Sequence, residues 1–185
     1  MSKANGEYDT VKSAILSHSV RLFCEKGVHE TSIGDIAEAT NLSKGTLYYH
    51  YKAKSDLVND VADMHLIWVS DVMFTWVNGL ERNCTDEVVL TLFDMLTTNE
   101  TESRLHCVLL TYAVSDETLI EKLRARYKEW RIMLEVGSLK MASPYSERTR
   151  ALSELFFTIV DGCMLETNAG ITGSYRDQLK LLLKQ

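Results

Sequence analysis

Apolar residues recur along most of this chain with the ~3.6-residue period of an amphipathic helix. In the first segment Val11, Ile15, Leu22 and Phe23 follow this spacing, and Gly27 stands where a helix would end. The same period returns in residues 57–80, 88–96, 105–112, 119–134 and 152–164, and a short apolar helix is expected around 179–183. Breaks are expected at 99–103 and 142–146. The pattern predicts an all-α protein of about nine helices rather than a strand-containing fold.

Two short helices are expected directly after the first one. Ser32 precedes Ile33 and has Asp35 three residues later, which is close to a capping box. Residues 41–43 are expected to form a polar turn in which Leu42 is the one apolar residue, and Ser43 can cap a third helix over residues 44–51. Two short helices joined by a tight turn predict a helix-turn-helix.

The composition permits a packed core without cross-links. The chain has 185 residues, of which 45% are hydrophobic and 25% charged. Four scattered cysteines form no CxxC pair, so we expect no disulfides, no zinc and a reducing, cytoplasmic location. The polar N-terminus and the absence of ~18 consecutive apolar residues predict neither a signal peptide nor a membrane span.

The distribution of charge keeps a nucleic-acid partner in consideration. The net charge of −6 argues against DNA, because Lys and Arg supply the attraction to phosphates. However, residues 1–55 hold seven basic and six acidic side chains (+1), and residues 56–185 hold thirteen and twenty (−7). A nearly neutral reading head on an acidic body is compatible with DNA binding.

Residues 23–57, FCEKGVHETSIGDIAEATNLSKGTLYYHYKAKSDL, resemble the DNA-binding module of the tetracycline-repressor (TetR) family. The shared marks are Phe-x-x-Lys-Gly, the pair Thr31-Ser32, the turn, Gly-Thr-Leu-Tyr at 45–48 and Lys-x-Lys-x-x-Leu ending at Leu57. This resemblance covers about a third of the chain, and only the helical pattern and the length extend it further. His18 and Ser19 stand where the family usually has small residues such as alanine, so the packing of the first helix is expected to differ.

The resemblance implies that residues 44–50 form the helix that reads DNA. Ser43 and Gly45 leave its N-terminal end uncrowded, and we expect Lys44, Thr46 and Tyr48 to contact base edges. Leu47 should anchor the helix to the core. The other residues of the site are expected to contact mainly phosphates and methyl groups. The complete expected DNA-binding set is Thr31, Ser32, Lys44, Gly45, Thr46, Tyr48, Tyr49, His50, Lys52 and Lys54.

The resemblance also implies a DNA-binding domain at residues 1–53 and a helical ligand-binding and dimerisation domain at 54–185. The expected lining of a ligand cavity is His65, Trp68, Trp76, Phe93, His106, Leu109, Tyr112, Tyr127 and Trp130. The last helices are expected to pair with those of a second copy. The expected interface residues are Leu152, Leu155, Phe156, Ile159, Val160, Cys163, Leu179 and Leu182.

Plainer interpretations stand beside these expectations. The body aromatics could be ordinary core residues, and the lysines a solvated face. At least one tyrosine of residues 48–51 must point outward, because three within four residues cannot share one core. His65, His106, Cys107 and Cys163 include good metal-ligand types, but their spacing favours core packing, so neither a metal nor a cofactor is expected.

These patterns predict a dimeric transcriptional regulator, most simply a repressor that an unknown small molecule releases from a pseudo-palindromic operator. Its expected partners are double-stranded DNA, a second copy of itself and that effector, with no membrane. One alternative is a DNA-binding architectural dimer without an effector. A small helical enzyme is the other, although the sequence has no Ser/His/Asp ordering, phosphate loop or HExxH motif.

Overall fold

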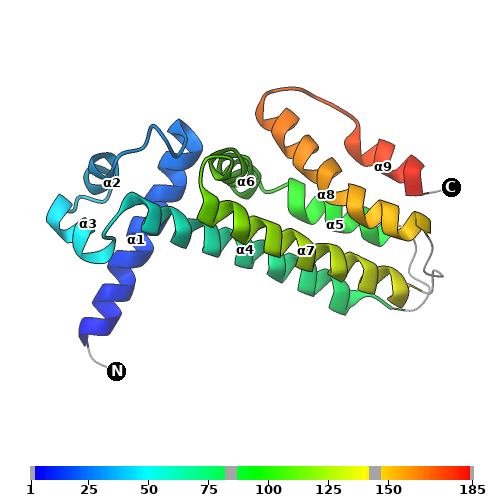
Figure 1. Ribbon diagram of the computed structural model, residues 1–185, viewed down its shortest axis with the longest axis horizontal. Coiled ribbons are helices and arrows are strands. Elements are labelled where there is room, and N and C mark those ends of the chain that lie inside the picture. The colour runs from blue at the N-terminus through cyan, green and yellow to red at the C-terminus, as the bar shows by residue number, and fades with distance from the viewer. Residues whose placement is uncertain (1–2, 82–86, 142–146, 184–185) are drawn as a thin grey trace.

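The computed structural model describes residues 3–81, 87–141 and 147–183, which form nine α-helices and no strand (Figure 1). An all-α fold was expected, and the structure confirms it. The helices are α1 (Lys3–Lys26), α2 (Ile33–Ala39), α3 (Lys44–His50), α4 (Lys54–Gly79), α5 (Glu87–Thr97), α6 (Glu100–Ala113), α7 (Glu117–Lys140), α8 (Glu147–Asn168) and α9 (Tyr175–Leu183).

The helices form two groups that α4 connects (Figure 1). We call α1–α3 the head and α4–α9 the body. In the body α4 and α7 run side by side in the same direction, since Asp63 contacts Lys122 near their starts and Val77 contacts Lys140 near their ends. The chain then reverses, and α8 lies antiparallel to α7. This arrangement encloses a continuous apolar core between the helices.

Side chains of α4 and α6 attach the head to the body. Asp60 on α4 accepts a hydrogen bond of 3.1 Å from the Tyr51 hydroxyl and pairs with Lys12 of α1 at 2.7 Å. The ring of His29, in the loop after α1, lies 4.9 Å from the ring of Tyr112 on α6. The attachment of the head to the body therefore depends on side chains that α4 and α6 hold in place.

One break between helices is shorter than expected. Residues 99–103 were expected to be irregular, but α6 begins at Glu100 because the Asn99 side chain accepts a hydrogen bond from the backbone of Glu102 and caps the helix. The expected break at 142–146 lies outside the described residues, as does Cys84.

No helix among the described residues is both long enough and apolar enough to cross a membrane.

Candidate nucleic-acid interface

The third helix is held by its caps and by one buried side chain. Ser43 accepts a hydrogen bond of 3.0 Å from the backbone of Thr46, which satisfies a free N–H group at the start of α3. Leu47 in its middle is fully buried, as was expected, and Tyr51 after its end is 3% exposed. These contacts fix which side of α3 faces outward.

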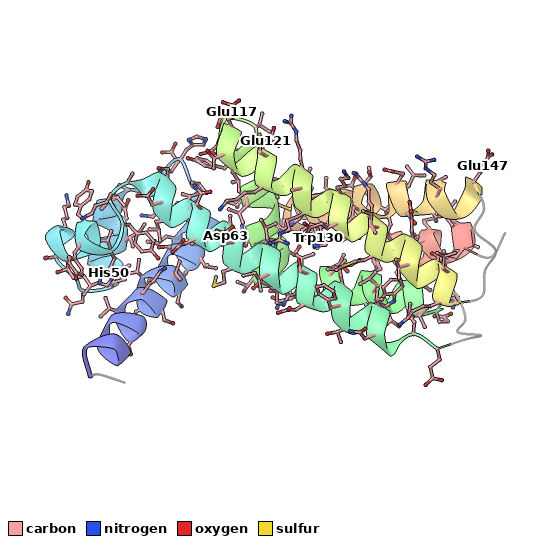
Figure 2. All side chains as sticks on the ribbon, turned by 60° about the horizontal axis from the view of Figure 1, so that its bottom comes forward. His50, Asp63, Glu117, Glu121, Trp130 and Glu147 are labelled. Atoms are coloured by element: carbon pink, nitrogen blue, oxygen red, sulfur yellow. The ribbon has the colours of Figure 1, made fainter. Side chains whose placement is uncertain are left out.

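The outward side of α3 carries large and polar groups. Tyr48 is 47% exposed and Tyr49 is 70% exposed, while Lys44 and Gly45 are also exposed. Thr46 and His50 are half-buried. Figure 2 places His50 in the head, at the end of the molecule away from the body. All six residues expected on this helix are therefore accessible to a partner.

The turn before α3 follows the helix-turn-helix pattern. Asn41 has a φ of 54°, in the left-handed region that asparagine adopts more readily than most residues. The backbone of Leu42 donates to the carbonyl of Ala37 at 2.9 Å, which closes α2. Gly34 on α2 faces Lys44, since a Cβ at Gly34 would lie 3.2 Å from Lys44 Cε. The lysine stem therefore crosses the start of α2.

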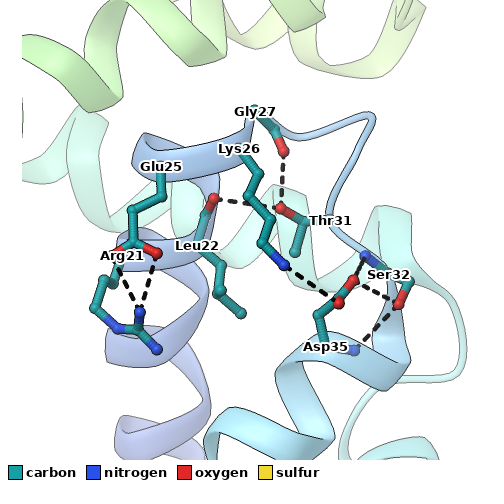
Figure 3. Close-up of polar contacts among 8 residues, drawn as sticks. All are labelled: Arg21, Leu22, Glu25, Lys26, Gly27, Thr31, Ser32 and Asp35. Carbon is teal, nitrogen blue, oxygen red and sulfur yellow. Dashed lines mark hydrogen bonds and ion pairs between the residues drawn. The ribbon is translucent and has the colours of Figure 1, made fainter.

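A network of charged and hydroxyl groups fixes the start of α2 (Figure 3). Ser32 and Asp35 form the expected capping box, in which the Ser32 backbone N–H donates to Asp35 at 2.7 Å and the Asp35 N–H donates to Ser32 at 3.1 Å. Lys26 adds an ion pair to Asp35 at 3.4 Å. The hydrogen bonds from Ser32 lower the pKa of Asp35 to about 2. The exposed Ser32 is thus held at the head surface.

Thr31 and Lys54 occupy positions that do not match the expected phosphate contacts. Thr31 is fully buried, and its hydroxyl donates to the carbonyls of Gly27 at 2.8 Å and Leu22 at 3.3 Å (Figure 3). The Lys54 ammonium donates to the carbonyl of His29 at 3.1 Å, and partial burial lowers its pKa. Lys52, in contrast, is exposed.

The body brings five of the nine expected ligand-lining residues together. His65, Trp68, His106, Tyr127 and Trp130 form one aromatic cluster, in which neighbouring ring centroids lie 5.1–6.2 Å apart. Figure 2 places Trp130 in the middle of the body. Because these side chains pack on one another, they form part of the packed core of the body.

The other four expected residues lie apart from this cluster. The Trp76 indole N–H donates to the carbonyl of Val88 at 2.7 Å and joins α4 to α5. Phe93 and Leu109 are buried core residues, and Tyr112 faces His29 at the head. Among the described residues, no group of three His, Cys, Asp or Glu side chains is arranged to hold a metal.

Two surface grooves lie between the head and the body instead. The larger has a volume of about 1080 Å³ and is lined mainly by α1 and α6, with Arg21, Cys24, Thr101 and Arg104 among its residues. The smaller, of about 490 Å³, shares Cys24 and Arg104 and reaches Tyr112. The sequence reasoning missed these grooves, because no local pattern indicates which faces of two distant helices will oppose each other.

The expected dimer residues fall into two sets. Phe156, Val160, Cys163 and Leu179 are at most 7% exposed and pack inside the chain, so they do not form a surface for a second copy. Leu155 is 53% exposed and Leu182 is 51% exposed, while Leu152 and Ile159 are half-buried. Leu165 and Leu181, which the sequence reasoning did not include, are each 58% exposed.

Comparisons with known proteins agree with the geometry of the head. Residues 15–61 match the model for bacterial regulatory proteins of the tetR family. The HTH-type transcriptional regulator AcrR of Shigella flexneri is 37% identical over 62 residues, which cover 34% of this chain and 29% of that protein. The HTH-type transcriptional repressor KstR2 of Mycobacterium tuberculosis is 27% identical over 86 residues, which cover 44% of this chain and 43% of that protein. The chain thus spans less than half the length of these curated relatives.

Solved structures extend the likeness to the whole fold. A protein of Saccharomonospora viridis, described as a transcriptional regulator and crystallised with choline, matches with a TM-score of 0.80 at 16% identity, over 95% of this chain and 94% of that one. A TerR/AcrR-family regulator of Aquifex aeolicus matches with a TM-score of 0.73 at 21% identity, over 93% and 99%. These relatives and neighbours are regulators and not enzymes, in agreement with the sequence-based expectation.

Proposed function

We propose that this chain is a DNA-binding transcriptional regulator of the TetR family and acts as a homodimeric repressor on a pseudo-palindromic operator. The observation that carries the proposal is the outward face of α3, which is fixed from below by the buried Leu47 and Tyr51. A helix with this exposed face fits the width of the major groove. We further propose that residues 1–53 and 54–185 act as the DNA-binding and regulatory domains.

Within α3 the roles divide by the chemistry of the side chains. Lys44, Thr46 and Tyr48 are the proposed readers of base edges, since they offer donors, an acceptor and apolar surface. Tyr49 and His50, with Gly45 allowing close approach, contact phosphates and thymine methyl groups. Ser32 and Lys52 contact the backbone, which positions the head without reading sequence. Thr31 supports the head from inside, and Lys54 holds the loop after α1 through the carbonyl of His29.

The proposed surface for the second copy is one face of α8 and the end of α9. Its α8 residues recur at intervals of three and four, so they share one side of the helix. A two-fold axis would bring this face of one copy against the same face of the second copy. It would set the two α3 helices roughly 34–36 Å apart on DNA. The proposed interface consists of Ala151, Leu155, Thr158, Gly162, Leu165, Leu181 and Leu182.

Repression and release by a small molecule are proposed from relatives. KstR2 is named a repressor, IcaR of Staphylococcus epidermidis is named a negative regulator, and the S. viridis neighbour was crystallised with choline. In this chain, a molecule bound in the groove between α1 and α6 would contact both head and body. It would shift the balance of head positions by its difference in affinity for them.

Selection of duplexes from a random library tests DNA binding and the division of roles. Tyr48→Ala should lower affinity and broaden the selected sequences, because it removes a base contact. Lys52→Ala should weaken all duplexes alike and reduce the slope of log affinity against log salt by about one. Identical behaviour of the two variants would refute the division, and failure to select any duplex would refute the function.

Two further measurements test the dimer and the effector. Light scattering should give twice the chain mass of 21.0 kDa. A metabolite screen by thermal shift should find compounds that raise the unfolding midpoint and also release the selected duplex. A monomer, or stabilising compounds that leave DNA bound, would contradict these parts of the proposal.

A further inference from the structure

A continuous chain of polar contacts crosses the core of the body. Glu102 contacts His65 Nδ1 at 2.7 Å, and His65 Nε2 contacts His106 Nδ1 at 2.9 Å. His106 Nε2 then contacts Asp161 at 3.1 Å and the Tyr127 hydroxyl at 3.0 Å, and this hydroxyl donates to Asp161 at 2.9 Å. The chain joins α4, α6, α7 and α8, so it links four of the six body helices.

The two histidines are shielded from water, whereas the carboxylates at the ends reach the surface. His65 is 1% exposed and His106 is 4% exposed, while the side chains of Glu102 and Asp161 are 21% and 27% exposed. Trp68 stacks on His65 with ring centroids 5.9 Å apart. A contact of the two buried histidines that lacks a proton therefore lowers the stability of the fold, because no water can replace the missing hydrogen-bond partner.

Counting protons gives the charge state that the contacts require. With both carboxylates ionised, the imidazoles need one ring proton toward Glu102, one between the two rings and one toward Asp161, which makes three. Two neutral imidazoles carry only two ring protons. Tyr127 cannot supply the third without withdrawing its proton from Asp161. One added proton satisfies every contact in the chain.

A second added proton does not fit. It would place two N–H groups against each other across the 2.9 Å contact between His65 and His106. Burial lowers the pKa of His65, the hydrogen bond that its ring donates to Glu102 opposes this, and the charge of His106 lowers it again. A folded-state pKa below the ordinary value means that charging His65 costs stability as the pH falls.

The remaining titratable groups around the pair do not supply the missing proton. Cys107 on α6 and Cys24 on α1 are thiols whose pKa values are raised by burial, so they stay neutral. Arg131 on α7 lies 5.8 Å from the centre of the Tyr127 ring and pairs with Glu154. The two carboxylates and the two imidazoles therefore decide the proton content of the chain.

We propose that Glu102, His65, His106, Tyr127 and Asp161 form a site that binds one proton and couples the pH to the position of the head. Loss of the proton leaves two acceptors facing each other between α4 and α6 or between α6 and α8. The helices separate at that contact, and α4 transmits the change to the head. The coupling to DNA rests on the proposed function, whereas the proton site does not.

Asp161→Asn is the decisive variant. The asparagine amide can donate to His106 and its carbonyl can accept from Tyr127, so both contacts of residue 161 are satisfied without an added proton. Asp63→Asn is the matched control, since Asp63 is a 51% exposed carboxylate on α4 that pairs with Lys122 (Figure 2). Both variants change one oxygen into an NH2 group and are compatible with the fold.

Histidine side-chain nitrogen NMR on the full chain measures the proton directly. As the pH is lowered, the pair formed by His65 and His106 should take up one proton in total, in the wild type and in Asp63→Asn. Asp161→Asn should take up none on this pair while remaining folded. Two independent uptakes, no uptake in the wild type, or unchanged uptake in Asp161→Asn would each overturn the proton site.

Binding to a duplex selected from the library tests the coupling. Wild-type affinity should change by up to about tenfold per pH unit where the pair titrates, and Asp161→Asn should lose this component. Any contribution of His50 is common to all three proteins and cancels in the comparison. Equal pH profiles of the wild type and Asp161→Asn overturn the coupling, whereas absence of binding at every pH refutes the proposed function and leaves the NMR result to decide the site.

Discussion

Truncation of Tyr49 to alanine should weaken DNA binding and leave the fold intact. Tyr49 is 70% exposed, whereas Leu47 on the same seven-residue helix is fully buried. Substitutions at exposed sites change stability by no more than about 0.5 kcal/mol. Leu47→Ala removes a fully enclosed side chain and should cost about 2–5 kcal/mol of unfolding free energy. The two variants thus separate the reading face of α3 from its anchor.

The expected loss of affinity follows from one contact. A hydrogen bond from the Tyr49 hydroxyl to a phosphate is worth about 1.5–3 kcal/mol. At about 1.4 kcal/mol for each factor of ten, Tyr49→Ala should bind the selected duplex about 10-fold to about 150-fold more weakly. Tyr49→Phe keeps the ring but not the hydroxyl, so it should show most of the same loss.

Fluorescence anisotropy with the selected duplex gives the affinities, and urea denaturation gives the stabilities. The reasoning fails if Tyr49→Ala binds as the wild type does, because the outward face would then not touch DNA. It also fails if Leu47→Ala keeps wild-type stability, because the helix would then not depend on its buried anchor. Partial loss of both properties in Tyr49→Ala would show that its ring belongs to the head core.

Three further predictions address the dimer, the packing of the body and the capping box. Leu155→Glu should halve the mass measured by light scattering without changing the helical circular dichroism, whereas Ile67→Glu on α4, 54% exposed, should leave the mass unchanged. Gly137→Ala should lower the unfolding free energy by about 1–3 kcal/mol in urea, because its Cβ would lie 2.5 Å from the Trp76 ring. Asp35→Asn should destabilise the head at pH 7, and the gap to the wild type should close as the pH falls, because a carboxyl with a pKa of about 2 loses its stabilising effect on protonation.

Local signals in the sequence were sufficient for the helix-turn-helix. Ser32 with Asp35 and Ser43 with Thr46 act within three residues, so their capping hydrogen bonds depend little on the rest of the chain. Gly27, with a φ of 86°, ends α1 for an equally local reason. The elements of the head, and most of its outward residues, could therefore be predicted without tertiary information.

Side-chain direction near the helix ends was less predictable. Thr31 and Ser32 are adjacent hydroxyl residues, yet Ser32 faces outward and Thr31 donates into the carbonyls that end α1. The buried orientation of Thr31 depends on where the end of α1 lies relative to α2. A sequence pattern places both residues at the start of α2 but does not decide which of them a phosphate can reach.

Periodicity on α8 did not separate the face that packs inside the chain from the face that is left for a partner. Phe156, Val160 and Cys163 form the stronger apolar stripe, and that stripe packs inside the chain. The exposed stripe contains Leu155 and Leu165 separated by smaller residues, which gives a weaker pattern. The hydrophobic period predicts that a face of the helix is buried, but it does not show whether a helix of the same chain or a second copy covers that face.

The polar chain in the body depends on residues that the sequence keeps far apart. Glu102 and Asp161 both approach histidines across helix boundaries, and neither has a neighbour in sequence that marks it. The polar chain reaches α4 close to the residue of this helix that contacts the head. His65 lies five residues after Asp60, which holds Tyr51 and Lys12 of the head, and five residues of helix span about 7.5 Å. A helix this short between two fixed points behaves as a rigid rod, so a displacement at His65 must appear at Asp60. This stretch of α4 is the route by which the proposed proton site would act on the orientation of the head.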